Sequence, residues 1–126
     1  MTKSRDIYFD HNATTAARQE VVDAMLPWFR EHFGNASSLH RPGQTARDAV
    51  EKARIEVAQL IGAEPEEILF TSGGTESDNI AVRGTLSVSA GRFPAPHIIT
   101  SSIEHPAILR TCRMLEREGV EVTFLP

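Results

Sequence analysis

The sequence has little of what several protein classes depend on. Its only cysteine is Cys112, so no disulfide within the chain can staple the fold. Lysine occurs only at Lys3 and Lys52, and the net charge of −4 comes without a basic cluster, which argues against nucleic acid as a partner. No apolar run approaches the ~20 residues that span a bilayer, and the first residues lack the apolar core of a signal peptide. These absences predict a reducing, cytoplasmic setting, with neither nucleic acid nor a membrane as partner.

Apolar residues recur at helical spacing through the first half of the chain. One helix is predicted from about Arg18 to His32, with a bend at Pro27. A second is predicted from about Pro42 to Ile61, with Gly62 as its C-terminal stop. The stretch between them is rich in Gly, Asn, Ser and Pro, which indicates a loop.

Strand-like and helix-like segments alternate in the second half of the chain. A buried strand centred on Ile68–Phe70 is predicted to lead into a helix capped by Ser72 and ending at about Val88. The segment HIITS is the next predicted strand, followed by a helix with Pro106 in its first turn and by a last strand, VEVTFL. Right-handed crossovers would place these three strands parallel in one sheet. The pattern predicts an α/β fold.

The stretch FTSGGTESDN, residues 70–79, places two glycines between a predicted strand and a predicted helix. Gly73 and Gly74 would let an anion approach the free amides and positive dipole end of the helix, and the Thr75 hydroxyl could donate a further hydrogen bond. No lysine follows as in a P-loop, which argues against a nucleoside triphosphate. Close packing of a glycine-rich turn explains the same residues, so both interpretations stay open.

A second polar turn, SSIEHPA, follows the next predicted strand. Because open α/β sheets bind ligands at the carboxyl ends of their strands, His105 is predicted to lie near the glycine turn. Its imidazole could stack on a planar ring or move a proton, although a histidine before a helix also serves as a simple cap. The two turns together favour a binding site. The other histidines have no metal-ligand spacing, so no metal site is predicted.

Five motifs resemble the N-terminal part of the cysteine desulfurases, which belong to the class V aminotransferase family of pyridoxal phosphate enzymes. In order, they are YFDHNATT, FGNASSLHRPG, ILFTSGGTESDN, HIITSSIEHPAIL and CRMLEREGVEVTFL. The resemblance implies the N-terminal portion of a fold-type I pyridoxal phosphate-dependent transferase, a three-layer α/β/α fold with a mainly parallel sheet, incomplete in this chain. It also implies that residues 1–16 belong to a small domain and that residues 17–126 begin the large cofactor-binding domain.

The resemblance assigns roles to individual residues. In that family the SG(A/G)TE turn holds the phosphate of pyridoxal 5′-phosphate, which makes Gly74 and Thr75 cofactor-binding residues here. The family's EH histidine stacks on the pyridine ring and moves protons, so His105 is both cofactor-binding and catalytic. Asn12 to Thr15 would lie near the mouth of the active site, and GNASSLH would approach a dimer-related site.

The implied activity is removal of sulfur from L-cysteine, giving L-alanine and an enzyme persulfide for iron–sulfur cluster assembly or thiolation. The complete enzyme is expected to be a homodimer that passes sulfur to acceptor or scaffold proteins. Its Schiff-base lysine and nucleophilic cysteine lie further along the family's chain. Here Lys52 lies on a polar helix face and Cys112 on an apolar stripe, so the isolated chain is predicted to be inactive. Two alternatives stay open: a sibling class V enzyme, such as a selenocysteine lyase or an aminotransferase, or a non-catalytic split or truncated fragment.

Overall fold

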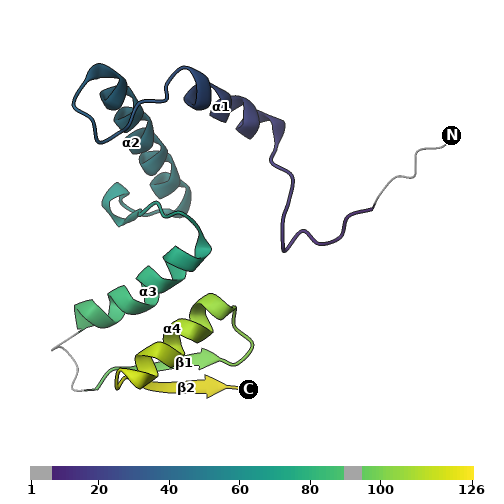
Figure 1. The fold of residues 1–126 in the computed structure, drawn as a ribbon, viewed down its shortest axis with the longest axis vertical. Coiled ribbons are helices and arrows are strands. Elements are labelled where there is room, and N and C mark those ends of the chain that lie inside the picture. Colours follow the sequence, from purple (N-terminus) through teal and green to yellow (C-terminus); the bar gives the residue numbers. More distant parts are fainter. Residues whose placement is uncertain (1–6, 90–94) are drawn as a thin grey trace. The chain divides into compact units, whose positions relative to one another are not determined.

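The computed structural model describes residues 7–89 and 95–126, so Lys3 lies outside the described residues. The chain forms two compact units, Met1–Ile68 and Leu69–Pro126 (Figure 1). Helices make up the regular structure of the first unit, whereas the second combines helices with a small sheet. The chain is therefore a mixed α/β protein, as predicted.

The first unit contains the two predicted helices, α1 (Gln19–Arg30) and α2 (Arg41–Ile61). In α1 the carbonyl oxygen of Pro27 accepts hydrogen bonds from the two backbone amides that follow the helix, which closes its C-terminal end. Helix α2 begins where the His40 imidazole accepts from the amide of Gly43, and it ends at Gly62, whose φ of 69° is the left-handed conformation that favours glycine. Both helix predictions are confirmed to within about two residues.

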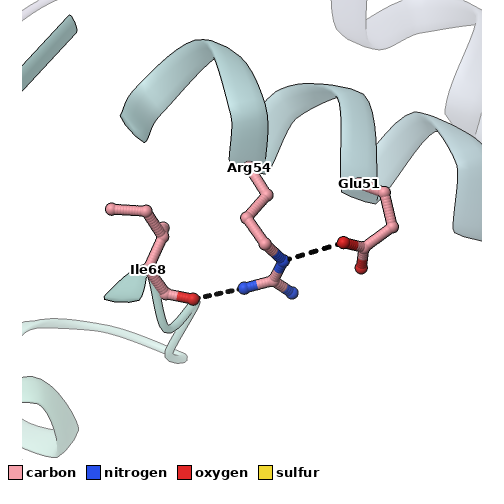
Figure 2. A network of polar contacts seen from close by, with 3 residues as sticks. All are labelled: Glu51, Arg54 and Ile68. Carbon is pink, nitrogen blue, oxygen red and sulfur yellow. Dashed lines mark hydrogen bonds and ion pairs between the residues drawn. The ribbon is translucent and has the colours of Figure 1, made fainter. Parts of the chain in front are cut away.

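A short 3-10 turn, η1 (Pro65–Glu67), packs against α2. Figure 2 shows how Arg54 of α2 holds the end of this turn. Its Nε donates to Glu51 Oε2 at 3.1 Å, and its Nη1 donates to the backbone carbonyl oxygen of Ile68. The guanidinium thus fixes the point at which the first unit ends.

The predicted strand at Ile68–Phe70 does not form. Ile68 has the extended backbone of a strand, with φ −93° and ψ 122°, but among the described residues only two other segments pair into a sheet. Leu69 and Phe70 are 64% and 47% exposed rather than covered on both faces. An apolar run favours an extended backbone, whereas a strand also requires a hydrogen-bonded neighbour.

The second unit contains α3 (Gly74–Ser89), β1 (His97–Ser101), α4 (Pro106–Arg117) and β2 (Glu121–Leu125). The two strands pair in parallel, with His97 opposite Glu121 and Ser101 opposite Leu125, as the predicted crossover requires. Helix α4 lies along the pair and contacts both β2 and α3 (Figure 1). Its buried face forms the centre of this unit and consists of Ala107, Thr111, Cys112 and Leu115.

Candidate functional site

The glycine turn before α3 is held by a carboxylate. Oε2 of Glu76 accepts hydrogen bonds from the amide and the hydroxyl of Ser72, at 2.6 and 2.7 Å. These two bonds lower the pKa of the Glu76 carboxyl below its ordinary value, and the bond from the Ser72 amide has the larger effect. The prediction that Ser72 caps α3 is wrong, because its hydroxyl donates to Glu76 instead of accepting from a helix amide. The side chain of the first helical turn reaches back and fixes the chain that precedes it.

Gly73 and Gly74 face open space. A Cβ placed on either residue would meet no atom within 4 Å among the described residues. Packing within the described part of the chain therefore does not explain why these positions are glycine. Because the first amides of an α-helix have no partner inside the helix, Gly74 and Thr75 offer donors beside this bare backbone. The arrangement favours the approach of an anion, the other interpretation of the turn.

His105 is the residue that caps α4, and its ring stays accessible. Its Nδ1 accepts a hydrogen bond from the amide of Ala107 at 3.2 Å. In the neutral ring Nδ1 then carries no proton, so Nε2 is the protonated nitrogen. The side chain is exposed, which leaves Nε2 and the ring face available. Capping and site roles are therefore compatible, because they use different parts of the imidazole.

One cavity of about 380 Å³ brings the predicted site residues of the two turns together. Thr75 of α3 and His105 at the start of α4 both line it, and Gly74 is the neighbour of Thr75 in the chain. The exposed Arg110 of α4 lines the same cavity and adds a cationic group. No hydrogen bond involves the Thr75 hydroxyl within the described residues, so that donor is free to serve a ligand. The predicted proximity of the two turns is confirmed.

Two polar residues of this cavity were not predicted. Asn79 Nδ2 donates to the carbonyl oxygen of Thr75 at 2.8 Å, and Thr111 Oγ1 lies 2.7 Å from Asn79 Oδ1. Their positions carried a usable signal: Asn79 lies four residues after Thr75, on the same face of α3. Likewise, Thr111 in the middle of α4 lies four residues after Ala107, on the same face of that helix.

The other candidate residues, Lys52, Cys112 and Asn12 to Thr15, do not line this cavity. Lys52 is exposed and its Nζ lies 3.8 Å from Glu56 Oε1, so it has the environment of a surface lysine. Cys112 is 0% exposed, and burial raises the pKa of its thiol. A thiol in this setting behaves as a small hydrophobic side chain, as predicted. Asn12 to Thr15 belong to the first unit, where Thr15 Oγ1 lies 2.8 Å from His11 Nδ1.

Nowhere in residues 7–89 and 95–126 do three His, Cys, Asp or Glu side chains come close enough to hold a metal ion. Within the same ranges, every helix is too short or too polar to cross a membrane.

The chain is similar to cysteine desulfurases from distant organisms. It is 53% identical over 125 residues to cysteine desulfurase IscS of Methanosarcina thermophila, which covers 99% of this chain and 30% of that protein. It is 48% identical over 126 residues to the mitochondrial cysteine desulfurase of Drosophila melanogaster, covering 99% of this chain and 27% of that protein. The chain thus spans about a third or less of the length of these relatives.

The chain also matches solved structures, and a family match covers residues 7–126. A NifS-like protein matches with a TM-score of 0.85 and 40% identity, over 95% of this chain and 32% of that one. A structure of SspA in complex with cysteine matches with a TM-score of 0.82 and 41% identity, over 94% of this chain and 33% of that one. The family described as aminotransferase class-V matches residues 7–126. Because that match takes in all the described residues, the chain belongs to the class-V aminotransferase family, as its N-terminal motifs predicted.

Proposed function

We propose that this chain forms the phosphate-binding and ring-stacking part of a pyridoxal phosphate-dependent cysteine desulfurase. The observation that carries the proposal is the cavity shared by Thr75 and His105, beside two glycines that packing does not explain. The similarity to cysteine desulfurases over 99% of the chain supports the substrate L-cysteine. The match to SspA, a protein described in complex with cysteine, supports it as well.

The residues present fit the cofactor's two ends. The amides at the start of α3 and the Thr75 hydroxyl would hold the phosphate, because they are hydrogen-bond donors at the positive end of a helix dipole. The open face of Gly73 and Gly74 would let the phosphate approach the backbone. The exposed ring of His105 would stack on the pyridine. When bound, pyridoxal phosphate supplies the electron sink for reactions at the amino-acid carbon atoms.

The proton chemistry available to this chain lies at the imidazole of His105. Because Nδ1 accepts from the amide of Ala107, the neutral ring carries its proton on Nε2 and offers that N–H as a hydrogen-bond donor. The same hydrogen bond limits rotation of the imidazole, so its plane is set before any ligand arrives. Accepting a substrate proton therefore requires Nδ1 to give up the Ala107 hydrogen bond, and the imidazolium so formed could return a proton from Nε2.

The chain does not supply every group the reaction needs. A Schiff-base lysine requires a desolvated site and sulfur transfer requires an accessible thiolate, whereas Lys52 is exposed and Cys112 is buried. Both reactive groups must come from other parts of a complete desulfurase. We propose that such an enzyme has the three-layer fold-type I architecture, with residues 1–16 in a small domain and residues 17–126 in the large one. It would act as a cytoplasmic homodimer that delivers sulfur to acceptor or scaffold proteins.

A chimera tests the proposal directly. In it, this chain replaces the part of the Methanosarcina thermophila desulfurase that it matches. The chimera is expected to bind pyridoxal 5′-phosphate and to form L-alanine from L-cysteine. Thr75→Val should weaken cofactor binding roughly tenfold or more, since a hydrogen bond to a charged group is worth about 1.5–3 kcal/mol. Binding is measured by equilibrium dialysis.

Thr85→Val is the matched control for Thr75→Val. Thr85 lies on the same helix, and its hydroxyl donates to the carbonyl oxygen of Ala81 at 2.7 Å. This variant also loses one hydroxyl, but we expect cofactor affinity to stay within about twofold of the parent. Equal affinity of all three proteins for the cofactor would make Thr75 a packing residue and remove the proposed phosphate site.

His105→Ala should lower the rate of alanine formation by the chimera, because the proton-transferring ring is lost. The isolated 126-residue chain should form no alanine or sulfide from L-cysteine above the background of free cofactor. Clear turnover by the isolated chain, abolished by Cys112→Ser or Lys52→Ala, would mean that the reactive groups are assigned wrongly. Turnover of L-selenocysteine alone by the chimera would point to a sibling activity instead.

A further inference from the structure

Asn79 joins the two turns that line the cavity. From the second turn of α3 its amide nitrogen donates to the carbonyl oxygen of Thr75 at 2.8 Å. Its amide oxygen lies 2.7 Å from the hydroxyl of Thr111, which is only 4% exposed. Thr111 Oγ1 also lies 2.8 Å from the carbonyl oxygen of Ala107, the residue whose amide donates to His105. A continuous polar path thus runs from Thr75 to the cap of α4.

Chemistry fixes the direction of this path. A carbonyl oxygen can only accept, so the Asn79 atom that faces Thr75 must be its NH₂ group. The Asn79 oxygen then faces the Thr111 hydroxyl, which can donate its one proton to this oxygen or to Ala107. Reversing the amide would place two oxygen atoms against each other at Thr75. The Asn79 amide therefore has one favourable orientation, and the single Thr111 proton serves one of its two acceptors at a time.

We propose that Asn79 is a positioning residue for the reaction, and the proposal rests on the function proposed above. It touches neither cofactor nor substrate in this role. Its two hydrogen bonds tie the first turn of α3 to the middle of α4, which fixes the phosphate donors at Thr75 relative to the ring of His105. A cofactor that must meet both groups at once binds more tightly when their spacing is set in advance.

The location of the network favours this role over a general contribution to stability. Both bonds of Asn79 lie within one turn of the cavity lining, and Thr111 itself lines the cavity. Further along the same helices, Arg83 Nη1 of α3 donates to Met114 Sδ of α4 at 3.7 Å, and Arg83 Nη2 lies 3.9 Å from Oε2 of Glu118, the residue that caps the end of α4. That exposed pair can hold the helices together without influencing the turn. Asn79 is the connection at the end that carries the site.

The test uses the chimera and measures two quantities for each variant: the dissociation constant of pyridoxal 5′-phosphate and the unfolding midpoint of the cofactor-free protein. Asn79→Leu removes both hydrogen bonds at similar volume. We expect its dissociation constant to rise about tenfold, the effect of losing one or two neutral hydrogen bonds. Thr111→Val removes only the hydroxyl and should raise it about threefold to tenfold. Thr111→Ser keeps the donor and should stay within about twofold of the parent.

A matched control separates positioning from stability. Thr85→Val loses a side-chain hydrogen bond to the backbone of α3, at a position with no bond to α4 among the described residues. If Asn79 acts only on stability, then Asn79→Leu and Thr85→Val should shift affinity equally for an equal change in midpoint. The positioning role requires a larger loss of affinity for Asn79→Leu at matched stability. It also requires the double variant Asn79→Leu/Thr111→Val to lose less than the product of the single effects.

Failure of this inference differs from failure of the proposed function. A parent chimera that folds and binds no cofactor would overturn the proposed function, and the positioning role with it. A parent that binds the cofactor and loses affinity on Thr75→Val, but not on Asn79→Leu or Thr111→Val, would overturn the role of Asn79 alone. If Asn79→Leu does not fold, the contrast between Thr111→Val and Thr111→Ser decides the question, since equal affinities of these two would also exclude it.

Discussion

Gly34 in the loop before α2 and Gly43 in the first turn of that helix differ from Gly73 and Gly74, at the start of α3, in what surrounds them. In the first unit, a Cβ on Gly34 would lie 2.2 Å from a backbone oxygen, and one on Gly43 would lie 2.5 Å from another. In the second unit, a Cβ on Gly73 or Gly74 would meet no described atom within 4 Å. Glycine is required by packing in the first case, whereas in the second it leaves a surface bare.

The two segments also differ in how they are held. The loop before α2 is closed by side chains of that helix: Arg47 Nε donates to the carbonyl oxygen of Ala36 at 2.9 Å, and Gln44 Nε2 donates to that of Leu39 at 3.0 Å. The turn before α3 is held by Glu76, which accepts from Ser72, and by the Thr71 and Ser77 hydroxyls, which donate to the carbonyl oxygen of Gly73. The first amides of α3 have no partner within the helix. The loop before α2 is packed and hydrogen-bonded by its own unit, so its structure does not require a ligand. A turn with open donors is suited to a ligand.

Alanine substitutions test this contrast where the effect should be largest. Gly34→Ala is expected to lower the free energy of unfolding by about 2–3 kcal/mol, because backbone atoms must move to admit the methyl group. Gly73→Ala should change the free energy of unfolding by less than about 1 kcal/mol, since the methyl group meets open space. Urea denaturation of the cofactor-free chimera measures both.

Cofactor binding provides the converse measurement. Gly73→Ala should weaken binding of pyridoxal 5′-phosphate, because the added methyl group stands where the phosphate approaches. Gly74→Ala should also weaken binding, because its methyl group would stand on the same open face, while its first helical position makes it neutral or slightly stabilising for folding, by up to about 1 kcal/mol. If Gly73→Ala and Gly34→Ala destabilise the protein equally, the contrast between the two segments is wrong.

Substitutions of Cys112 measure how tightly the buried face of α4 is packed. The second unit buries one face of α4, and the Cys112 side chain is 0% exposed there. Cys112→Ser should lower the free energy of unfolding by about 1–3 kcal/mol, because it places a polar hydroxyl at a fully buried position of an apolar face. Thermal unfolding of the cofactor-free chimera measures the change.

The comparison with Cys112→Ala separates polarity from size. The alanine variant leaves a small cavity and should be less destabilised than the serine variant. Alanine formation by the folded chimera should be the same for both variants and the parent, since a buried thiol is not the nucleophile. A selective loss of activity in both variants at unchanged stability would assign Cys112 a chemical role.

Local patterns in the sequence were sufficient for the helices and their ends. The spacing of apolar residues and the glycine after α2 predicted where this helix stops, because the left-handed conformation at Gly62 is a local property. The strands His97–Ser101 and Glu121–Leu125 and their parallel pairing were also predicted, since the intervening helix makes them neighbours. Each of these features depends on contacts over a short length of chain.

Features that depend on distant contacts were missed. The apolar run at Ile68–Phe70 gave no sign of whether a neighbouring strand would pair with it. The hydrogen bond between Asn79 and Thr111 joins residues 32 positions apart, so the local sequence around either residue does not predict its partner. The sequence likewise could not separate the packed glycines of one loop from the open glycines of the other. For the candidate site, motif resemblance supplied Gly74, Thr75 and His105, and the structure added the network that connects them.

The smallest expected effect concerns the carboxylate that holds the open turn. Hydrogen bonds from Ser72 lower the pKa of Glu76 below its ordinary value of 4.5 in the folded chain. A carboxyl whose pKa is lower in the folded state contributes stability above its unfolded value, and this contribution is lost as pH falls through the folded value. The order of the turn should therefore persist near neutral pH and weaken below about pH 4.5. Because Glu76 is exposed, we expect this change to be confined to the turn.

The Ser72 amide signal, followed by NMR in the parent chimera and in its Glu76→Gln variant, measures this loss of order in the turn. At neutral pH the two proteins should differ, since the neutral amide is a weaker acceptor than a carboxylate. Below the folded pKa of Glu76 their Ser72 signals should converge. A difference that does not change with pH would show that shape, and not the carboxylate charge, holds the turn.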